Sequence, residues 1–441
     1  MNQNPYFSYA ESFQKLTETG KQLPFGKIKP EKKTVPEKNA PVAMILSPHP
    51  DDECIVGALP IRLMREAGFR IVNCAVTLGS KVERREERLA ELQSACKWIG
   101  YELEEMDVGE LKKVTLESRQ SQIEHWQSFV EKVIFDGKKA IGIRVKIKNK
   151  VQTIYANKEV ILSGGSINSP QLLMVSGVGP ADHLKEKGIE IVHELKGVGK
   201  NLQDHLETYI QQECNTPDTL YSYVNKLSMM KIGIQWFLNK SGPCSTSFLE
   251  AGGFCKSSSD KDYPNIQFHF FPAFVIDHGL VDPDRHGFQL HASLNQPKSR
   301  GEITLNSSNP YDYPKIQFNY LKEEYDLEET VKCVHVAREI LKQSSMKPYA
   351  GKEIGPGEKA NSDEEIREYI RSKAETAYHP SCTLKMGIDD MAVVDEKLKI
   401  HGLQNIRVAD ASIMPEITSG NLNAPTLMIG ERAADFIQNQ I

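Results

Sequence analysis

The chain has 441 residues, which is too long for a single ordinary hydrophobic core and indicates two or three domains. Its composition, with 39% hydrophobic and 26% charged residues, is that of a globular protein, and its formal net charge of -5 gives no reason to expect a nucleic acid or an anionic membrane as partner. No run of about 18 apolar residues is present, so we expect no transmembrane segment.

The cysteines and the first residues bear on the cellular compartment. Eight cysteines are scattered along the chain without a C-x-x-C pair. The first residues contain no basic region followed by an apolar one, so they do not resemble a secretory signal. We therefore expect reduced thiols and a cytoplasmic location.

Strands and helices alternate in the first part of the chain. Apolar runs predict strands at residues 42–47, 70–78 and 102–106, and segments with helical spacing separate them at 57–67 and 81–99. Strands that alternate with helices favour a parallel sheet. The sequence therefore predicts an α/β segment with a truncated, Rossmann-like parallel sheet.

After about residue 128 the pattern changes to short strands joined by turns. Residues 129–135, 140–147 and 152–155 predict antiparallel strands, and a strand at 160–162 ends in glycines before a helix at 170–175. Further along, the predicted strands are 266–271 and 302–305, and the predicted helices are 324–343 and 363–373. This part of the chain is typical of an α+β fold with an antiparallel sheet.

A run of charged residues, Pro48-His49-Pro50-Asp51-Asp52-Glu53, directly follows the first predicted strand. Chemistry in open α/β sheets gathers at the carboxyl ends of the strands. One imidazole and several carboxylates on a tight turn suit zinc or a similar divalent ion, and a spare carboxylate can deprotonate a bound water. An acidic turn that stabilises the N-terminus of the next helix explains the same residues, and both interpretations stay open.

Residues 1–128 resemble the PIG-L/LmbE-like zinc deacetylase family in the segments SPHPDDECIVGALP, VNCAVTLGS and RREERLAEL. The resemblance implies that His49 and Asp52 bind zinc and that Asp51 is the general base. The family's third ligand is a histidine further downstream, and His125 does not match its motif. A catalytic zinc needs three protein ligands, so the implied zinc site is incomplete.

Three later segments could carry chemistry of another kind. A glycine-rich turn, Gly164-Gly165, leads into a helix, as at sites where backbone approaches a cofactor phosphate. His379 precedes a proline, which holds its backbone extended. The segment from Val408 to Ile437 is a strand, an asparagine-rich bend and a helix. Taken singly, each segment is better explained as an ordinary turn, an ordinary histidine or a capped loop.

Together these segments resemble the glucose-methanol-choline (GMC) oxidoreductase family, and within it the choline dehydrogenases. The match covers residues 129–441 and includes GVGKNLQDH, FLEAGGF, KSRGEITL, AYHPSCTLKMG and VADASIMP. The resemblance implies parts of an FAD domain at 129–205 and 376–441, and a substrate-binding domain with an antiparallel sheet at 206–375.

The GMC resemblance also implies a reaction. An alcohol such as choline binds beside FAD, His379 takes the hydroxyl proton, Asn421 hydrogen-bonds the developing alkoxide, and hydride passes to the flavin. The product from choline is betaine aldehyde, on the route to glycine betaine. Glu250 is a candidate partner for a quaternary ammonium group, although an ordinary surface glutamate is an equal alternative. The positions implied near FAD are Val133, Asp410, Ala411, Asn423 and Pro425; the electron acceptor stays unknown.

The G-x-G-x-x-G turn that holds an FAD diphosphate is absent from the sequence. Residues 177–182 (GVGPAD) and 197–202 (GVGKNL) both lack the third glycine. Both implied sites are therefore incomplete, and a non-catalytic recombined hybrid is a third hypothesis beside the oxidoreductase and the deacetylase.

Overall fold

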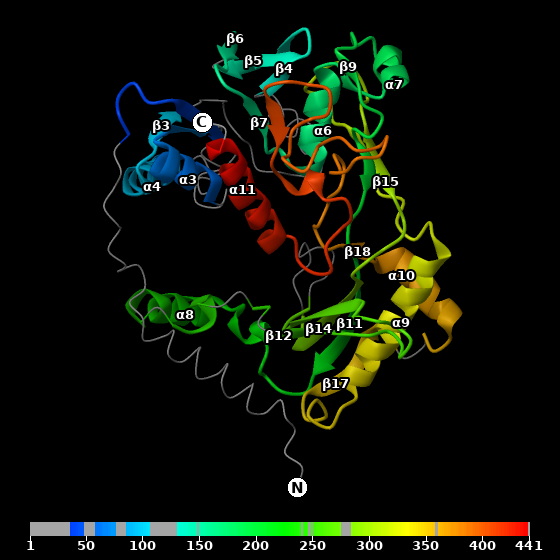
Figure 1. Ribbon diagram of the computed structural model, residues 1–441. Coiled ribbons are helices and arrows are strands. Elements are labelled where there is room, and N and C mark those ends of the chain that lie inside the picture. The colour runs from blue at the N-terminus through cyan, green and yellow to red at the C-terminus, as the bar shows by residue number, and fades with distance from the viewer. Residues whose placement is uncertain are drawn as a thin grey trace.

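The computed structural model describes residues 36–47, 58–75, 85–105, 130–147, 150–239, 241–245, 248–249, 251–274, 284–357 and 360–439. His49, Asp51, Asp52 and Glu250 lie outside the described residues. The fold has an N-terminal α/β module beside the last helix, a set of small sheets near it, and a larger antiparallel sheet with its own helices (Figure 1).

The N-terminal module is the predicted parallel α/β unit. Strands β1 (Val42–Ser47), β2 (Arg70–Ala75) and β3 (Glu102–Glu105) pair in parallel in the order β1-β2-β3. Helices α3 (Ala58–Ala67) and α4 (Arg85–Ile99) connect them. The alternation of strand and helix in the sequence was therefore sufficient to predict this arrangement.

The module packs on the C-terminal helix α11 (Asn423–Gln438), which lies beside α3 in Figure 1. Ile437 of α11 belongs to the module's own buried core, together with Leu63 and Ile71. Arg62 of α3 donates to Glu431 Oε2 at 2.9 Å and to Asp435 Oδ1 at 2.7 Å on α11. Apolar contact and ion pairing thus hold the two helices together.

A two-stranded parallel sheet forms the centre of the next part, where β7 (Val160–Leu162) pairs with β19 (Ile406–Val408). Ile161 of β7 packs against both the module's core and the larger core around β7. Within the described residues β1–β3 remains a separate sheet. The module therefore joins the rest of the chain through a helix and side-chain packing, without adding a strand to β7.

Helix α6 (Gly165–Val175) begins five residues before the predicted start at Pro170, so that prediction was wrong. Proline is common at the first helical position and rare in a helix interior. In the structure Pro170 lies inside the helix and lacks the N–H that would bond to the Ser166 carbonyl. The Thr383 hydroxyl donates to that carbonyl instead, at 2.7 Å.

The larger sheet is antiparallel and has the order β12-β13-β14-β11-β17, with β18 also paired to β11. Buried residues of α9, including Cys333 and Ala337, pack on Ile210 and Leu290 of this sheet. Helix α10 packs on α9 through Ile366. The bounds are β11 Leu206–Cys214, β12 Ala251–Cys255, β13 Ile266–Phe271, β14 Gly287–Leu294, β17 Ala350–Gly355, β18 Glu375–Thr376, α9 Glu324–Leu341 and α10 Asp363–Lys373.

The remaining elements are small sheets, short connections and the helix α8. An antiparallel sheet β4-β5-β6 lies beside β7, and β10, β15 and β16 form another. Their bounds are β4 Val130–Asp136, β5 Lys139–Ile147, β6 Lys150–Tyr155, β8 Val178–Gly179, β9 His193–Glu194, β10 Lys200–Leu202, β15 Gly301–Thr304, β16 Lys315–Gln317, α7 Ala181–Glu186, α8 Lys226–Asn239, η2 Leu220–Tyr223, η3 Pro243–Ser245 and η5 Ala411–Ile413.

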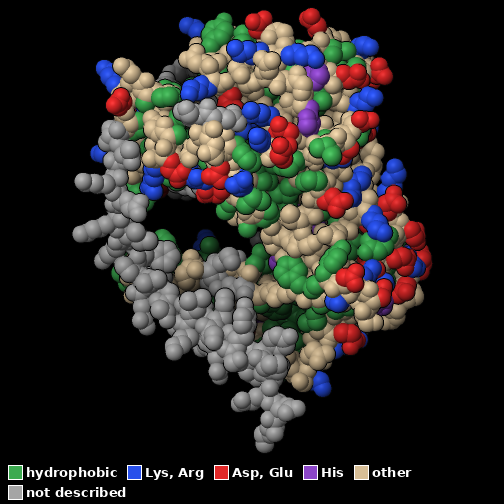
Figure 2. All heavy atoms as spheres, in the orientation of Figure 1, with side chains coloured by type: hydrophobic (Ala, Val, Ile, Leu, Met, Phe, Trp, Pro, Cys, Tyr) green, Lys and Arg blue, Asp and Glu red, His purple; other side chains and the backbone are tan. Residues whose placement is uncertain are grey.

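The surface and the helices give two further observations. Acidic and basic side chains are interspersed over the described part of the face in Figure 2, without one extended field of a single sign. Of the helices in the described part of the chain, each is too short or too polar to cross a membrane.

Candidate active site

The loop that carries His379 has an unusual backbone. Tyr378 and Cys382, on either side of it, have φ of 60° and 75°, in the left-handed region that non-glycine residues seldom adopt. The segment after β10 holds this loop in place: Ser381 N donates to the Gln203 carbonyl at 2.9 Å, and Ala377 N donates to the His205 carbonyl at 2.9 Å. Surrounding structure must impose such a conformation, which is typical of functional loops.

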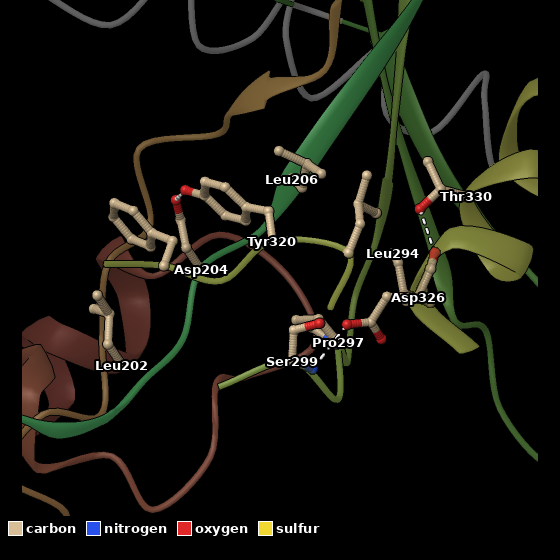
Figure 3. Close-up of a pocket in the computed structure, with 11 residues that line it drawn as sticks. Leu202, Asp204, Leu206, Leu294, Pro297, Ser299, Tyr320, Asp326 and Thr330 are labelled. Carbon is tan, nitrogen blue, oxygen red and sulfur yellow. Dashed lines mark hydrogen bonds between the residues drawn. The ribbon is translucent and has the colours of Figure 1, made fainter. Parts of the chain in front are cut away.

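Asp204 supplies a second set of bonds to the loop. Its Oδ1 accepts from the backbone N–H of His379 at 2.9 Å, and its Oδ2 accepts from Thr376 Oγ1 at 2.5 Å and from the Tyr320 hydroxyl. Burial raises the pKa of Asp204, although these three hydrogen bonds oppose the shift. In Figure 3 Tyr320 and Asp204 meet at one wall of a small cavity, which neither His379 nor Asn421 lines.

Two histidines meet behind the loop. Nδ1 of His205 lies 2.9 Å from Nδ1 of His379, and Nε2 of His205 lies 2.9 Å from the Asn295 carbonyl oxygen. Burial lowers the pKa of His205 to about 4 and also lowers the pKa of His379. Both imidazoles are therefore neutral near pH 7.

The structure brings the two predicted reacting side chains together. Nδ2 of Asn421 lies 3.3 Å from Nε2 of His379. Oδ1 of Asn421 accepts from Gln267 Nε2 at 2.7 Å, so the amide presents its N–H group to His379. A neutral imidazole can accept a proton, and an amide N–H beside it can donate to an oxygen, so this pair is suited to removing a proton from a hydroxyl group.

Glu207 organises the neighbouring sheet surface. Its two carboxylate oxygens accept from His269 Nδ1 at 3.2 Å and from His291 Nδ1 at 2.8 Å. Burial on its own raises the pKa of Glu207, but these bonds lower the pKa to about 2. The hydrogen bond that His269 Nδ1 donates to Glu207 raises the pKa of His269, whose Nε2 lies 3.4 Å from Asn421 Oδ1.

The predicted FAD contacts lie in part at one edge of the β7–β19 sheet. The strands run in parallel, so the turn after β7 and residues Asp410 and Ala411 after β19 share that edge. The Asp410 carboxylate is already occupied, since it accepts from Gly165 N at 3.0 Å and Ser169 Oγ at 2.6 Å. Any contact of Asp410 with a cofactor therefore falls to its backbone.

Two observations at this edge fit the approach of a polar group. Gly165 has φ of +74°, and a Cβ added there would meet no atom within 4 Å. The buried Ser166 hydroxyl has no hydrogen-bond partner among the described residues, which is uncommon for a native buried group. The turn from β7 into α6 thus has open space and an unused hydrogen-bonding group.

The other predicted positions have different surroundings. Val133 is buried in β4, and its N–H donates to Ser176 Oγ at 2.8 Å. Asn423 and Pro425 lie in the first turn of α11, close in sequence to Asn421. No group of three side chains suited to a metal occurs among the described residues, and the predicted zinc ligands fall outside them.

Sequence reasoning missed several residues of this network. Asp204 and His205 lie inside the motif GVGKNLQDH, which carried the family resemblance, but the motif alone gave them no role. Glu207, Gln267 and His269 join the site only through the pairing of β11, β14 and β13. An alternating polar pattern in these strands was the available signal.

Comparison with known proteins defines the class. Residues 80–207 and 297–430 match two family models that are both described as GMC oxidoreductase. The chain therefore belongs to the GMC oxidoreductase family.

Among individual relatives, the chain is 50% identical over 316 residues to human mitochondrial choline dehydrogenase, covering 71% of this chain and 53% of the relative. It is 47% identical over 313 residues to the oxygen-dependent choline dehydrogenase of Brucella ovis, covering 70% of this chain and 57% of the relative. A formate oxidase structure from Aspergillus oryzae matches with a TM-score of 0.67 at 25% identity, over 71% of this chain and 60% of that one. The chain spans about half the length of the curated relatives it matches.

The N-terminal family match changes one interpretation. It begins at residue 80, so residues 80–128, which were interpreted as part of a deacetylase-like segment, also carry similarity to GMC oxidoreductases. These matches are all to oxidoreductases: the two family models, the two choline dehydrogenases and the formate oxidase. They give no support to a deacetylase part.

Proposed function

We propose that the protein is an FAD-dependent oxidoreductase that acts on the CH–OH group of an alcohol, with choline as substrate and betaine aldehyde as product. The observation that carries the proposal is the pair formed by His379 Nε2 and Asn421 Nδ2, which are 3.3 Å apart beside strand β13 of the antiparallel sheet. The similarity to choline dehydrogenases supports the choice of substrate.

His379, Asn421 and Glu250 have different roles in the proposed oxidation. Nε2 of His379 accepts the hydroxyl proton of the alcohol, because the imidazole is neutral and its Nε2 carries a lone pair. The amide of Asn421 donates to the same oxygen as negative charge develops on it. Bound FAD supplies the acceptor for the hydride from the carbon. The carboxylate of Glu250 is proposed to face the quaternary ammonium.

The FAD contacts that we propose come from the turn at Gly165 and Ser166, the backbone of Asp410 and Ala411, and the positions of Val133, Asn423 and Pro425. The open space at Gly165 and the unused hydroxyl of Ser166 support this assignment. The chain lacks the usual G-x-G-x-x-G turn, so binding by these groups must be tested directly.

The test is anaerobic reduction of FAD-loaded protein by choline, followed by visible absorption. This readout needs no external electron acceptor. We expect flavin bands to survive desalting and to bleach with choline, and we expect His379→Ala to keep the flavin but bleach roughly 10² to 10⁴ times more slowly. A protein that emerges colourless contradicts the proposal and supports a non-catalytic hybrid.

The zinc deacetylase alternative depends on the His49, Asp51 and Asp52 motif. Metal analysis of protein purified without chelators decides it, since a zinc enzyme must hold close to one zinc per chain. Protein with only traces of zinc would exclude this alternative.

A further inference from the structure

The proton on the His205 ring can be placed from geometry. The Asn295 carbonyl, 2.9 Å from His205 Nε2, can only accept a hydrogen bond. Nε2 of His205 therefore carries a proton. His205 is fully buried, a setting that favours the neutral ring, so its Nδ1 is an unprotonated acceptor.

The contact between the two histidines then determines which nitrogen of the His379 ring carries the proton. Nδ1 of His205 and Nδ1 of His379 are 2.9 Å apart, and the rings are nearly perpendicular, at 88°. One proton must lie between the two nitrogens, and His205 cannot supply it. The proton therefore belongs to Nδ1 of His379, and Nε2 of that ring is left with its lone pair.

The rest of the site agrees with this assignment. The Asn421 amide presents Nδ2 to His379 Nε2, because its Oδ1 is occupied by Gln267. An amide N–H can only donate, which requires an unprotonated Nε2. Asp204 bonds the backbone N–H of His379 and, in the described structure, no atom of its ring.

We propose that His205 is a positioning residue that holds His379 in the tautomer with the proton on Nδ1, so that Nε2 faces the substrate as a base. The second nitrogen of a histidine is commonly set by the bond that the first one makes. The catalytic consequence rests on the proposed function, whereas the tautomer itself is a property of the protein alone.

The test uses ¹⁵N NMR of the histidine side chains in the whole 441-residue chain at neutral pH, which distinguishes a protonated ring nitrogen from a bare one. His379→Gln identifies the signals. We expect a protonated Nδ1 and a bare Nε2 on His379 in the unaltered protein, and a loss of that single tautomer in His205→Leu. In His205→Gln the amide N–H can donate to Asn295 and the amide oxygen can accept from His379, so we expect the tautomer to be retained.

His193→Gln is the matched control. It removes another bond between an imidazole and a carbonyl, His193 Nε2 to His401 O at 3.1 Å, without contacting the site, and must leave the His379 signals unchanged. If the protein turns over choline, we also expect flavin reduction to slow by about 10²-fold in His205→Leu and by less than about threefold in His205→Gln.

Two results would overturn the proposal: a proton on Nε2 of His379 in the unaltered protein, or an unchanged Nδ1 proton in folded His205→Leu. If His205→Leu does not fold, the spectra of the unaltered protein and of His205→Gln still decide the matter. Because NMR requires no flavin, failure of the proposed oxidation leaves this test intact.

Discussion

Glu207 is a single carboxylate that orders two histidines, since its oxygens accept from His269 and His291 on adjacent strands. The two histidines pair with each other in the β13–β14 register. The Nε2 atom of His269 lies 3.0 Å from Gln267 Nε2, and the Nε2 atom of His291 lies 2.6 Å from Gln289 Nε2. Each of these five side chains therefore has at least one hydrogen-bond partner within the sheet.

A first prediction concerns Glu207→Gln, which should destabilise the fold by roughly 2–4 kcal/mol, as expected for loss of one partner in a buried ion pair. The Glu207 contribution is present above its unfolded pKa of 4.5 and disappears as the pH falls through about 2. The His269 contribution is present below 6.5 and disappears as the pH rises through its raised pKa. Urea unfolding should therefore show the largest difference between pH 4.5 and 6.5.

A difference between Glu207→Gln and the unaltered protein that stays constant from pH 3 to 9 would show that the effect is one of packing alone. Glu353→Gln, which removes a different half-buried pair with Arg338, is the control for a general loss of charge.

A second prediction concerns the pH dependence of the proposed oxidation. Burial lowers the pKa of His379, so the neutral base persists below the usual imidazole value of 6.5. The acidic limb of kcat/KM for choline should accordingly have its midpoint below pH 6.5. A midpoint above that value would mean that another group controls the limb.

At the residue scale the sequence named His379 and Asn421, which the structure places 3.3 Å apart, but not the residues that hold them in place. The motifs around His379 and Asn421 are local and could be recognised from neighbouring residues. His205 and Glu207 acquire their partners from residues more than 60 positions away, through strand pairings that no local pattern encodes.

At the scale of elements, strong local signals gave accurate predictions. Helix α10 was predicted at 363–373 and has those bounds, because Ser362 and Glu365 form a capping box at its start. The strands at 42–47, 160–162 and 266–271 were also predicted correctly. The start of α6 was mispredicted because a tertiary bond from Thr383 compensates for the interior proline.

The contact between α3 and α11 gives a third prediction. Arg62→Ala removes the bonds to Glu431 and Asp435, at a cost of about 1 kcal/mol for partly exposed pairs. Hydrogen exchange should accelerate in both helices, and added salt should reduce the difference from the unaltered protein because it screens the pairs.

Arg285→Ala is the matched control for Arg62→Ala, since Arg285 makes exposed ion pairs with Asp284 and Glu213 on the antiparallel sheet. It should leave exchange in α3 and α11 unchanged. Unchanged exchange in α11 of Arg62→Ala would mean that apolar packing alone joins the helices.

At the scale of the whole molecule, the sequence predicted a parallel sheet followed by an antiparallel one, and the described residues contain both, whereas the Rossmann-like character of the first part stays a prediction. It could not predict how they meet, because the contact of α3 with α11 depends on the shapes of two surfaces. Leu59 packs against both buried cores, so the core of the N-terminal module and the core around β7 are separate clusters that contact through partly buried side chains.

A fourth prediction follows for ligand binding by the whole chain. FAD at about 100 times its dissociation constant should stabilise the fold by about 2.7 kcal/mol, measurable as a rise in Tm. Ser166→Ala should melt at the same temperature or slightly higher without FAD, because it removes a buried hydroxyl without a described partner, and should gain less from FAD. If FAD raises the Tm of the unaltered protein and of Ser166→Ala by the same amount, the Ser166 hydroxyl lies outside the cofactor site.

Helix α11 runs from the residues next to Asn421 to the N-terminal module, where it contacts α3. Asn421 lies two residues before its first turn, while its last turns carry the carboxylate and apolar groups that α3 contacts. Sixteen residues make a stiff rod of about 24 Å. We expect a tilt imposed near Asp435 to be carried along this helix to Asn421, so that changes at the contact with α3 reach the proposed active site.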